Sequence, residues 1–107
     1  MTKIEESIFL MISNAGSAKS YIFEALRESR KGKFDRVPDL LKSADDELKK
    51  AHSIQTELLQ MEAAGGSGES VSLLMVHAQD HLMTVMLAKD LAEEMIEMNR
   101  ASHRAGD

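Results

Sequence analysis

The sequence predicts an all-α fold, an up-down-up bundle of three helices. Apolar residues recur at steps of three and four along most of the 107-residue chain, which is the spacing of one face of a helix. A single proline and the lack of alternating β-branched runs give no sign of strands. Eight methionines against three phenylalanines and one tyrosine indicate an adaptable core of aliphatic and thioether side chains. A chain of this length fits one small domain.

We expect the first helix over residues 2–30. Its apolar positions form a heptad seam that comprises Ile4, Ile8, Met11, Ala15, Ala18, Ile22 and Ala25. Gly32 follows this helix and suits the left-handed conformation of a C-terminal cap. The helix is therefore expected to end just before this glycine.

The second helix is expected over residues 35–63, with Asp35 as its N-cap. Pro38 then lies in the first turn, where its missing N–H is harmless. The seam of this helix comprises Val37, Leu41, Ala44, Leu48, Ala51 and Leu58, with Gln55 filling one position. We interpret His52 as a partly exposed, hydrogen-bonded side chain.

A glycine-rich stretch predicts a loop at residues 64–68, and either Ser67 or Ser70 can cap a third helix over residues 69–99. The polar tail at residues 101–107 is expected to fray. Apolar residues cover most of the circumference of the third helix, so it should pack against more than one neighbour. We therefore expect a homo-oligomer that packs through this helix.

Composition excludes several classes of function. A net charge of −5 argues against a nucleic-acid partner, and the absence of cysteine excludes disulfides and thiolate chemistry. No signal peptide and no apolar run of about 18 residues is present, which predicts a soluble, cytoplasmic protein. The sequence has no glycine-rich nucleotide loop and no nucleophile elbow, so it does not indicate a self-contained enzyme.

The third helix carries the candidate site. A sector about 100° wide on this helix contains His77, Asp80, His81 and Thr84. Polar groups in an apolar segment cost free energy unless they are paired or used. They could be hydrogen-bonded histidines at a helix interface, a transition-metal site of two imidazoles and the Asp80 carboxylate, or a phosphoryl carrier. Their spacing leaves all three interpretations open.

Several features suit the carrier. A neutral imidazole is a good nucleophile near pH 7. Gln79, His81 and Thr84 offer donors to phosphoryl oxygens, although Gln79 points about 200° away from His77. Residues 71–88 contain no lysine or arginine. A fixed cation would hold the phosphoryl dianion in place, so its absence suits a relay.

The same segment carries a family resemblance. The lactose/cellobiose class of phosphotransferase-system enzyme IIA has a signature that is similar to VSLLMVHAQDHLMTVMLAKDL. The resemblance extends from the first helix through Met98, and includes GKFD after the first helix and EL-KAH-IQT in the second. HAQ in place of HGQ is more similar to the cellobiose and diacetylchitobiose members than to the lactose members.

This resemblance implies a trimer of three-helix protomers that forms a nine-helix bundle. It implies that His77 is the phosphorylated residue, with Gln79 and His81 as supporting residues of the active site. Asp80 matches an aspartate that lies at the trimer axis and can hold a divalent cation such as Mg²⁺. No organic cofactor is implied.

The resemblance also implies partners. Members of the class receive a phosphoryl group from the phosphocarrier HPr and pass it to enzyme IIB, which serves the membrane sugar channel IIC. The expected function is transfer during uptake of a β-linked disaccharide, of the cellobiose, diacetylchitobiose or lactose type. The alternative is a non-catalytic helical adaptor, or a metal-binding protein, whose histidines are structural.

Overall fold

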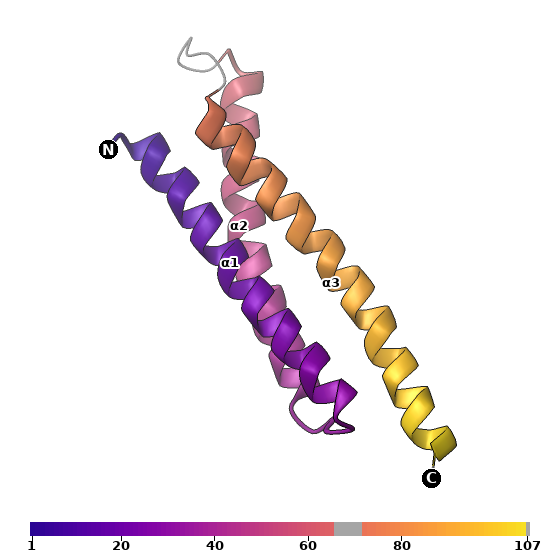
Figure 1. Cartoon of the computed structure of the whole chain (residues 1–107). Helices are drawn as coiled ribbons and strands as arrows, with labels where there is room; N and C mark the ends of the chain where they lie inside the picture. Colours follow the sequence, from indigo (N-terminus) through magenta and orange to yellow (C-terminus); the bar gives the residue numbers. More distant parts are fainter. Residues whose placement is uncertain (66–71, 107) are drawn as a thin grey trace.

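The computed structural model describes residues 1–65 and 72–106, and these residues contain three helices and no strand. They are α1 (Lys3–Arg30), α2 (Val37–Ala63) and α3 (Leu73–Gly106). Together they form a rod of 61 × 19 × 18 Å in which α2 runs opposite to α1 and α3 (Figure 1). The predicted all-α, up-down-up bundle is therefore confirmed for one chain.

Both ends of α1 follow from local chemistry. The Thr2 hydroxyl accepts a 3.1 Å hydrogen bond from the Glu5 N–H, and the Glu5 carboxylate accepts one of 3.1 Å from the Thr2 N–H. These bonds lower the pKa of Glu5 from its ordinary value of 4.5, and the bond from the Thr2 N–H has the larger effect. After Arg30, Gly32 has φ +79°, which confirms the predicted left-handed cap.

The start of α2 differs from the prediction. Asp35 is not the N-cap; the cap position is Arg36, which makes no side-chain capping bond. The Val37 N–H instead donates to the Phe34 carbonyl at 3.2 Å, and Pro38 has no N–H to satisfy. The backbone turn therefore removes the need for an aspartate cap.

The third helix starts and ends later than expected. Ser72 Oγ accepts a 3.1 Å hydrogen bond from the Met75 N–H and caps α3, whereas Ser67 and Ser70 lie outside the described residues. The predicted loop at 64–68 is described only as far as Gly65. At the other end, α3 continues to Gly106, where a frayed tail was expected from residue 101.

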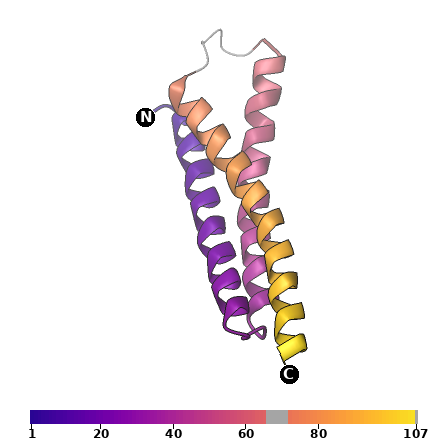
Figure 2. The same cartoon turned by 45° about the vertical axis from the view of Figure 1, so that its right-hand side comes forward.

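Contacts with the α1–α2 turn explain this longer helix. The Asn99 amide donates to the Ser29 hydroxyl at 2.9 Å, and the Arg100 guanidinium lies 4.6 Å from the centre of the Phe34 ring. The His103 ring packs edge-on against Phe34, with 5.8 Å between ring centroids. Figure 2 shows that the C-terminal end of α3 and this turn lie at the same end of the rod. Tertiary contacts therefore hold the last turns in place.

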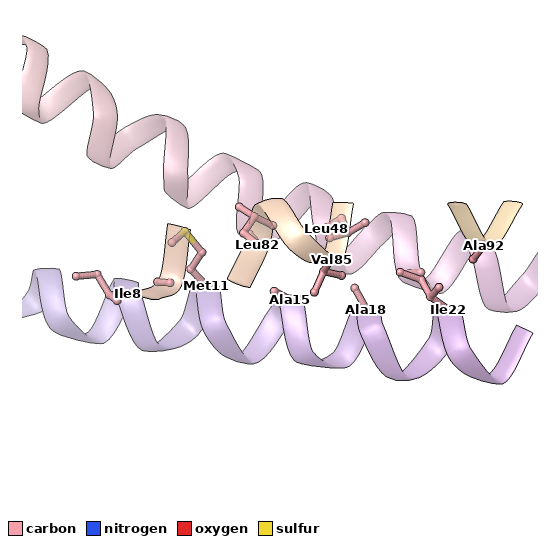
Figure 3. Packing of buried hydrophobic residues seen from close by; sticks show 12 residues of the cluster. Ile8, Met11, Ala15, Ala18, Ile22, Leu48, Leu82, Val85 and Ala92 are labelled. Carbon is pink, nitrogen blue, oxygen red and sulfur yellow. The ribbon is translucent and has the colours of Figure 1, made fainter. Parts of the chain in front are cut away.

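The core follows the predicted seams. On α1 every predicted seam residue except Ile4 is buried, and Ile4 is partly buried. On α2, Leu40 is buried in place of Leu41, which is only partly buried. The α1 seam packs along both other helices, whereas α2 and α3 contact each other at few points. Figure 3 shows Leu48 of α2 and Leu82 and Val85 of α3 gathered over the α1 seam. Within the described part of the chain, no helix is long and apolar enough to cross a membrane.

Candidate functional site

Helix α3 has two apolar faces. Its buried face packs on α1 and comprises Ala78, Leu82, Val85, Ala92 and Ile96. The opposite face, here called the α3 strip, is exposed and comprises Leu73, Val76, Met83, Leu87, Leu91 and Met98. These positions recur at steps of three, four and seven, so they form one continuous line on the helix. A long exposed apolar surface of this kind marks an interaction site.

His77 and His81 lie one helical turn apart along the edge of the α3 strip. Their rings are parallel within 5°, with centroids 6.4 Å apart. His77 is exposed and His81 is half-buried. Among the described residues, neither imidazole takes part in a hydrogen bond or an ion pair. In a single chain their nitrogens are therefore available for chemistry, and a hydrogen-bonded structural role is not observed.

Asp80 interrupts the α3 strip. It is exposed, and it lies one turn from both Val76 and Met83 along the helix. No cation of the described residues pairs with its carboxylate. If another molecule covers the strip, this carboxylate must lose water, which is unfavourable unless a cation or a proton neutralises it.

Gln79 faces away from the two histidines. Its amide oxygen accepts a 2.7 Å hydrogen bond from Nε2 of Gln55 on α2, and Gln55 is only 5% exposed. Within one chain the structure therefore does not bring Gln79 together with His77. One indication of this bond is visible in the sequence: Gln55 places an amide at an otherwise apolar seam position, where it needs a hydrogen-bond partner.

A groove between α2 and α3 contains His52 at its rim, but neither His77 nor His81. Its volume is about 370 Å³, and it is lined by Asp45, Leu48, Lys49, His52, Ser53, Met86, Lys89 and Asp90. His52 is exposed, and its carbonyl accepts a bond from the Thr56 hydroxyl. The groove is therefore separate from the paired histidines.

Lys89, which was not predicted as a site residue from the sequence, joins α2 to α3. Its ammonium lies 2.8 Å from the Asp45 carboxylate and also pairs with Glu93. Burial alone would lower the pKa of Lys89, but the bonds to the two carboxylates outweigh it and raise the pKa above 10.5. The spacing of four between Lys89 and Glu93 was a visible signal for half of this network.

The three-ligand metal site considered from the sequence is not formed in one chain. The described residues contain no group of three or more histidine, aspartate or glutamate side chains placed to hold a metal ion. A cation at Asp80 would complete its coordination with water or with ligands from further chains.

The model of the family "PTS system, Lactose/Cellobiose specific IIA subunit" matches residues 6–100. The lichenan-specific phosphotransferase enzyme IIA component of Bacillus subtilis is 45% identical over 96 residues, which cover 90% of this chain and 86% of the relative.

Two solved structures have the same fold. The crystal structure of the cellobiose-specific enzyme IIA of Bacillus anthracis matches with a TM-score of 0.91 and 38% identity, over 97% of this chain and 94% of that one. The IIA(Chitobiose) component of Escherichia coli, solved in complex with HPr, matches with a TM-score of 0.81 and 36% identity, over 96% and 99% of the two chains. This chain belongs to the lactose/cellobiose-specific IIA family of the phosphotransferase system.

Proposed function

We propose that His77 accepts a phosphoryl group from HPr and passes it to enzyme IIB. The observation that carries this proposal is the exposed His77 imidazole, which makes no hydrogen bond to the residues that the structure describes. It lies beside the parallel His81 ring and the apolar α3 strip. A relative with the same fold forms a complex with HPr, which supports HPr as the donor. The expected place of this exchange is the cytoplasm.

The chemistry needs one nucleophile and little else. The lone pair of a His77 ring nitrogen attacks phosphorus while the bond from phosphorus to the donor breaks. In the second transfer a nucleophile of enzyme IIB attacks the same phosphorus while its bond to the His77 nitrogen breaks. His81 and Thr84 share this face of α3 and supply donors to the phosphoryl oxygens. Because residues 71–88 contain no lysine or arginine, no fixed cation of this segment traps the dianion.

Gln79 enters the site only through assembly. Its amide is bonded to Gln55 of the same chain, on a different side of α3 from His77. A Gln79 from an adjacent protomer would be needed to reach the phosphoryl group. We therefore assign Gln79 a supporting role that depends on the oligomer.

The assembly that we propose is a trimer of three-helix protomers, with nine helices in all. The α3 strip supports it, since three such strips facing a common axis would bury their apolar side chains. The same packing brings three Asp80 carboxylates together. Like charges at short range cannot all stay ionised without a counter-charge.

Mg²⁺ would supply that charge at the axis. Carboxylate oxygens are the ligands that Mg²⁺ prefers, and water completes its octahedron. Asp80 fits this role because it is exposed on the strip and has no described cation partner in its own chain. The ion would neutralise charge and hold the protomers together, with no part in the transfer itself.

The substrate class follows from the relatives. Their names refer to lichenan, lactose, cellobiose, N,N'-diacetylchitobiose and oligo-beta-mannoside systems. We therefore propose a β-linked disaccharide as the transported sugar, with enzyme IIB of the same system as acceptor and membrane IIC as the channel.

One experiment separates a carrier from a non-catalytic adaptor. The chain is incubated with labelled phosphoenolpyruvate, enzyme I and HPr, and the bound label is counted before and after addition of enzyme IIB. A carrier gains one acid-labile phosphoryl group per chain and loses it to enzyme IIB; a mixture without HPr is the control. A chain that stays unlabelled in the complete mixture would be an adaptor.

A further inference from the structure

The two histidines of the site have the spacing of a metal chelate as well as that of a phosphoryl site. Side chains four residues apart on a helix have Cβ atoms about 5–6 Å apart. Zinc-binding helices use this spacing to place two imidazoles on one ion. The His77 and His81 rings, parallel and 6.4 Å apart, meet this first requirement.

In the single chain, both imidazoles are also accessible. His77 is exposed, His81 is half-buried, and neither is engaged by a side chain or carbonyl in the described ranges. Rotation of the two side chains is enough to bring one nitrogen of each to about 2.0–2.1 Å from a common ion. No lysine or arginine of residues 71–88 would repel a cation there, and the neighbouring Asp80 adds negative charge.

We infer that His77 and His81 form a two-imidazole site for a transition-metal ion of the Zn²⁺, Ni²⁺ or Cu²⁺ class, with water as the remaining ligands. This site differs from the axial one, because imidazole selects borderline metals whereas three carboxylates select Mg²⁺. Metal binding at this pair does not depend on the proposed function.

A regulatory consequence does rest on the proposed function. The ring nitrogen that attacks phosphorus uses the lone pair that a metal ion would occupy, so ion and phosphoryl group exclude each other at that nitrogen of His77. Since linkage is reciprocal, phosphorylation lowers metal affinity by the same factor by which metal lowers phosphoryl occupancy. Excess transition metal therefore halts the carrier reversibly.

Metal binding is tested by titrating the unphosphorylated full chain with Ni²⁺ or Zn²⁺ in excess Mg²⁺, followed by calorimetry. One ion per chain is expected, and His77→Ala and His81→Ala should each weaken it by about tenfold or more, because half of the imidazole ligands are lost. His52→Ala is the matched control, a single exposed histidine on α2, and should bind as wild type. The proposed metal site would be overturned if His81→Ala bound the ion as tightly as wild type, or if His52→Ala lost as much affinity for the ion as His81→Ala.

Competition is tested by the rate of transfer from phosphorylated HPr at rising Zn²⁺. His81→Ala keeps His77 as the phosphoryl acceptor, and HPr is still the phosphoryl donor. The inhibition of this variant, measured against its own rate without Zn²⁺, should therefore need about tenfold more Zn²⁺ than that of wild type. Transfer that is indifferent to saturating Zn²⁺ would refute the competition and leave the carrier intact. A chain that binds Zn²⁺ but never accepts phosphoryl would refute the carrier and leave the metal site intact.

Discussion

Nε2 of Gln55 lies 2.7 Å from Oε1 of Gln79, and this bond joins α2 to α3 two residues beyond His77. Gln55 is almost fully buried, at 5% exposure. Because α2 and α3 share few other contacts, the bond helps to fix the rotation of α3 about its own axis. That rotation sets the direction in which the helix face with the two histidines points.

A double-mutant cycle should show that the Gln55 and Gln79 amides are coupled in their contribution to the free energy of unfolding. We expect Gln55→Ala, Gln79→Ala and the double variant to give a coupling energy of about 0.5–1.5 kcal/mol, the usual net value of a hydrogen bond. The measurement is urea unfolding at one fixed protein concentration, since self-association would shift the midpoint. If the two single effects simply add, the amides do not interact.

Gly32→Ala should destabilise the fold by about 1–2 kcal/mol, because φ +79° is unfavourable for any residue with a Cβ. The added Cβ would also lie 2.8 Å from Cε1 of His103. Repeating the change in a His103→Ala background separates the two causes: the backbone cost should remain and the clash should disappear. A neutral Gly32→Ala would mean that neither the left-handed cap nor the His103 contact forms.

These two residues also show the limits of sequence reasoning about the fold. Gly32 was predicted as the cap because its conformation depends on local sequence alone. His103 was assigned to a fraying tail, since nothing near it in sequence holds it; its partners, Phe34 and the Arg30 carbonyl at 3.4 Å, are about 70 positions away. Asp35 failed as a cap for a local reason, because the bond from the Val37 N–H to the Phe34 carbonyl satisfies the donor that its side chain would have served.

The candidate site also has features that the sequence predicted and features that it could not predict. Helical spacing alone predicted that His77 and His81 share a face, and it gave the direction of Gln79. It could not predict that Gln79 bonds to Gln55, or that Lys89 reaches Asp45, because each pair joins two helices whose register is set by core packing. The family resemblance supplied the chemical role of His77, which spacing had left open.

Lys89→Met should reduce stability by about 1 kcal/mol or less at neutral pH, as is usual for a partly exposed ion pair. Its raised pKa means that the charged lysine stabilises the fold from neutral pH up to about 10.5, and that this contribution is lost as pH rises through the higher pKa of the folded state. The difference between wild type and Lys89→Met should therefore be constant to about pH 10 and then shrink.

Thermal melts across alkaline pH would measure this. Lys49→Met is the matched control, since Lys49 lines the same groove but no described carboxylate pairs with it. A gap that stays unchanged through the alkaline range would show that the Lys89 network does not stabilise the folded chain.

Asp80→Leu should tighten the proposed trimer. The substitution removes three repelling carboxylates and fills a break in the α3 strip, and replacing buried unpaired charge by apolar side chains is often stabilising by about 1–4 kcal/mol. Wild type should dissociate more readily when metal is chelated at raised pH, whereas the variant should not respond. Analytical ultracentrifugation with and without chelator measures both. A wild type whose assembly is indifferent to chelator at every pH would show that Asp80 does not lie at the axis.

Site mapping by mass spectrometry, after incubation with phosphoenolpyruvate, enzyme I and HPr, tests most directly whether His77 carries the phosphoryl group. We expect one modified residue, His77, in wild type. His81→Ala should be modified more slowly at the same residue, because its donor role is lost. His77→Ala should fold with unchanged helix content and accept nothing, since an exposed side chain contributes little to stability. Phosphorylation of His77→Ala at His81 or His52, at the wild-type rate, would contradict the assignment.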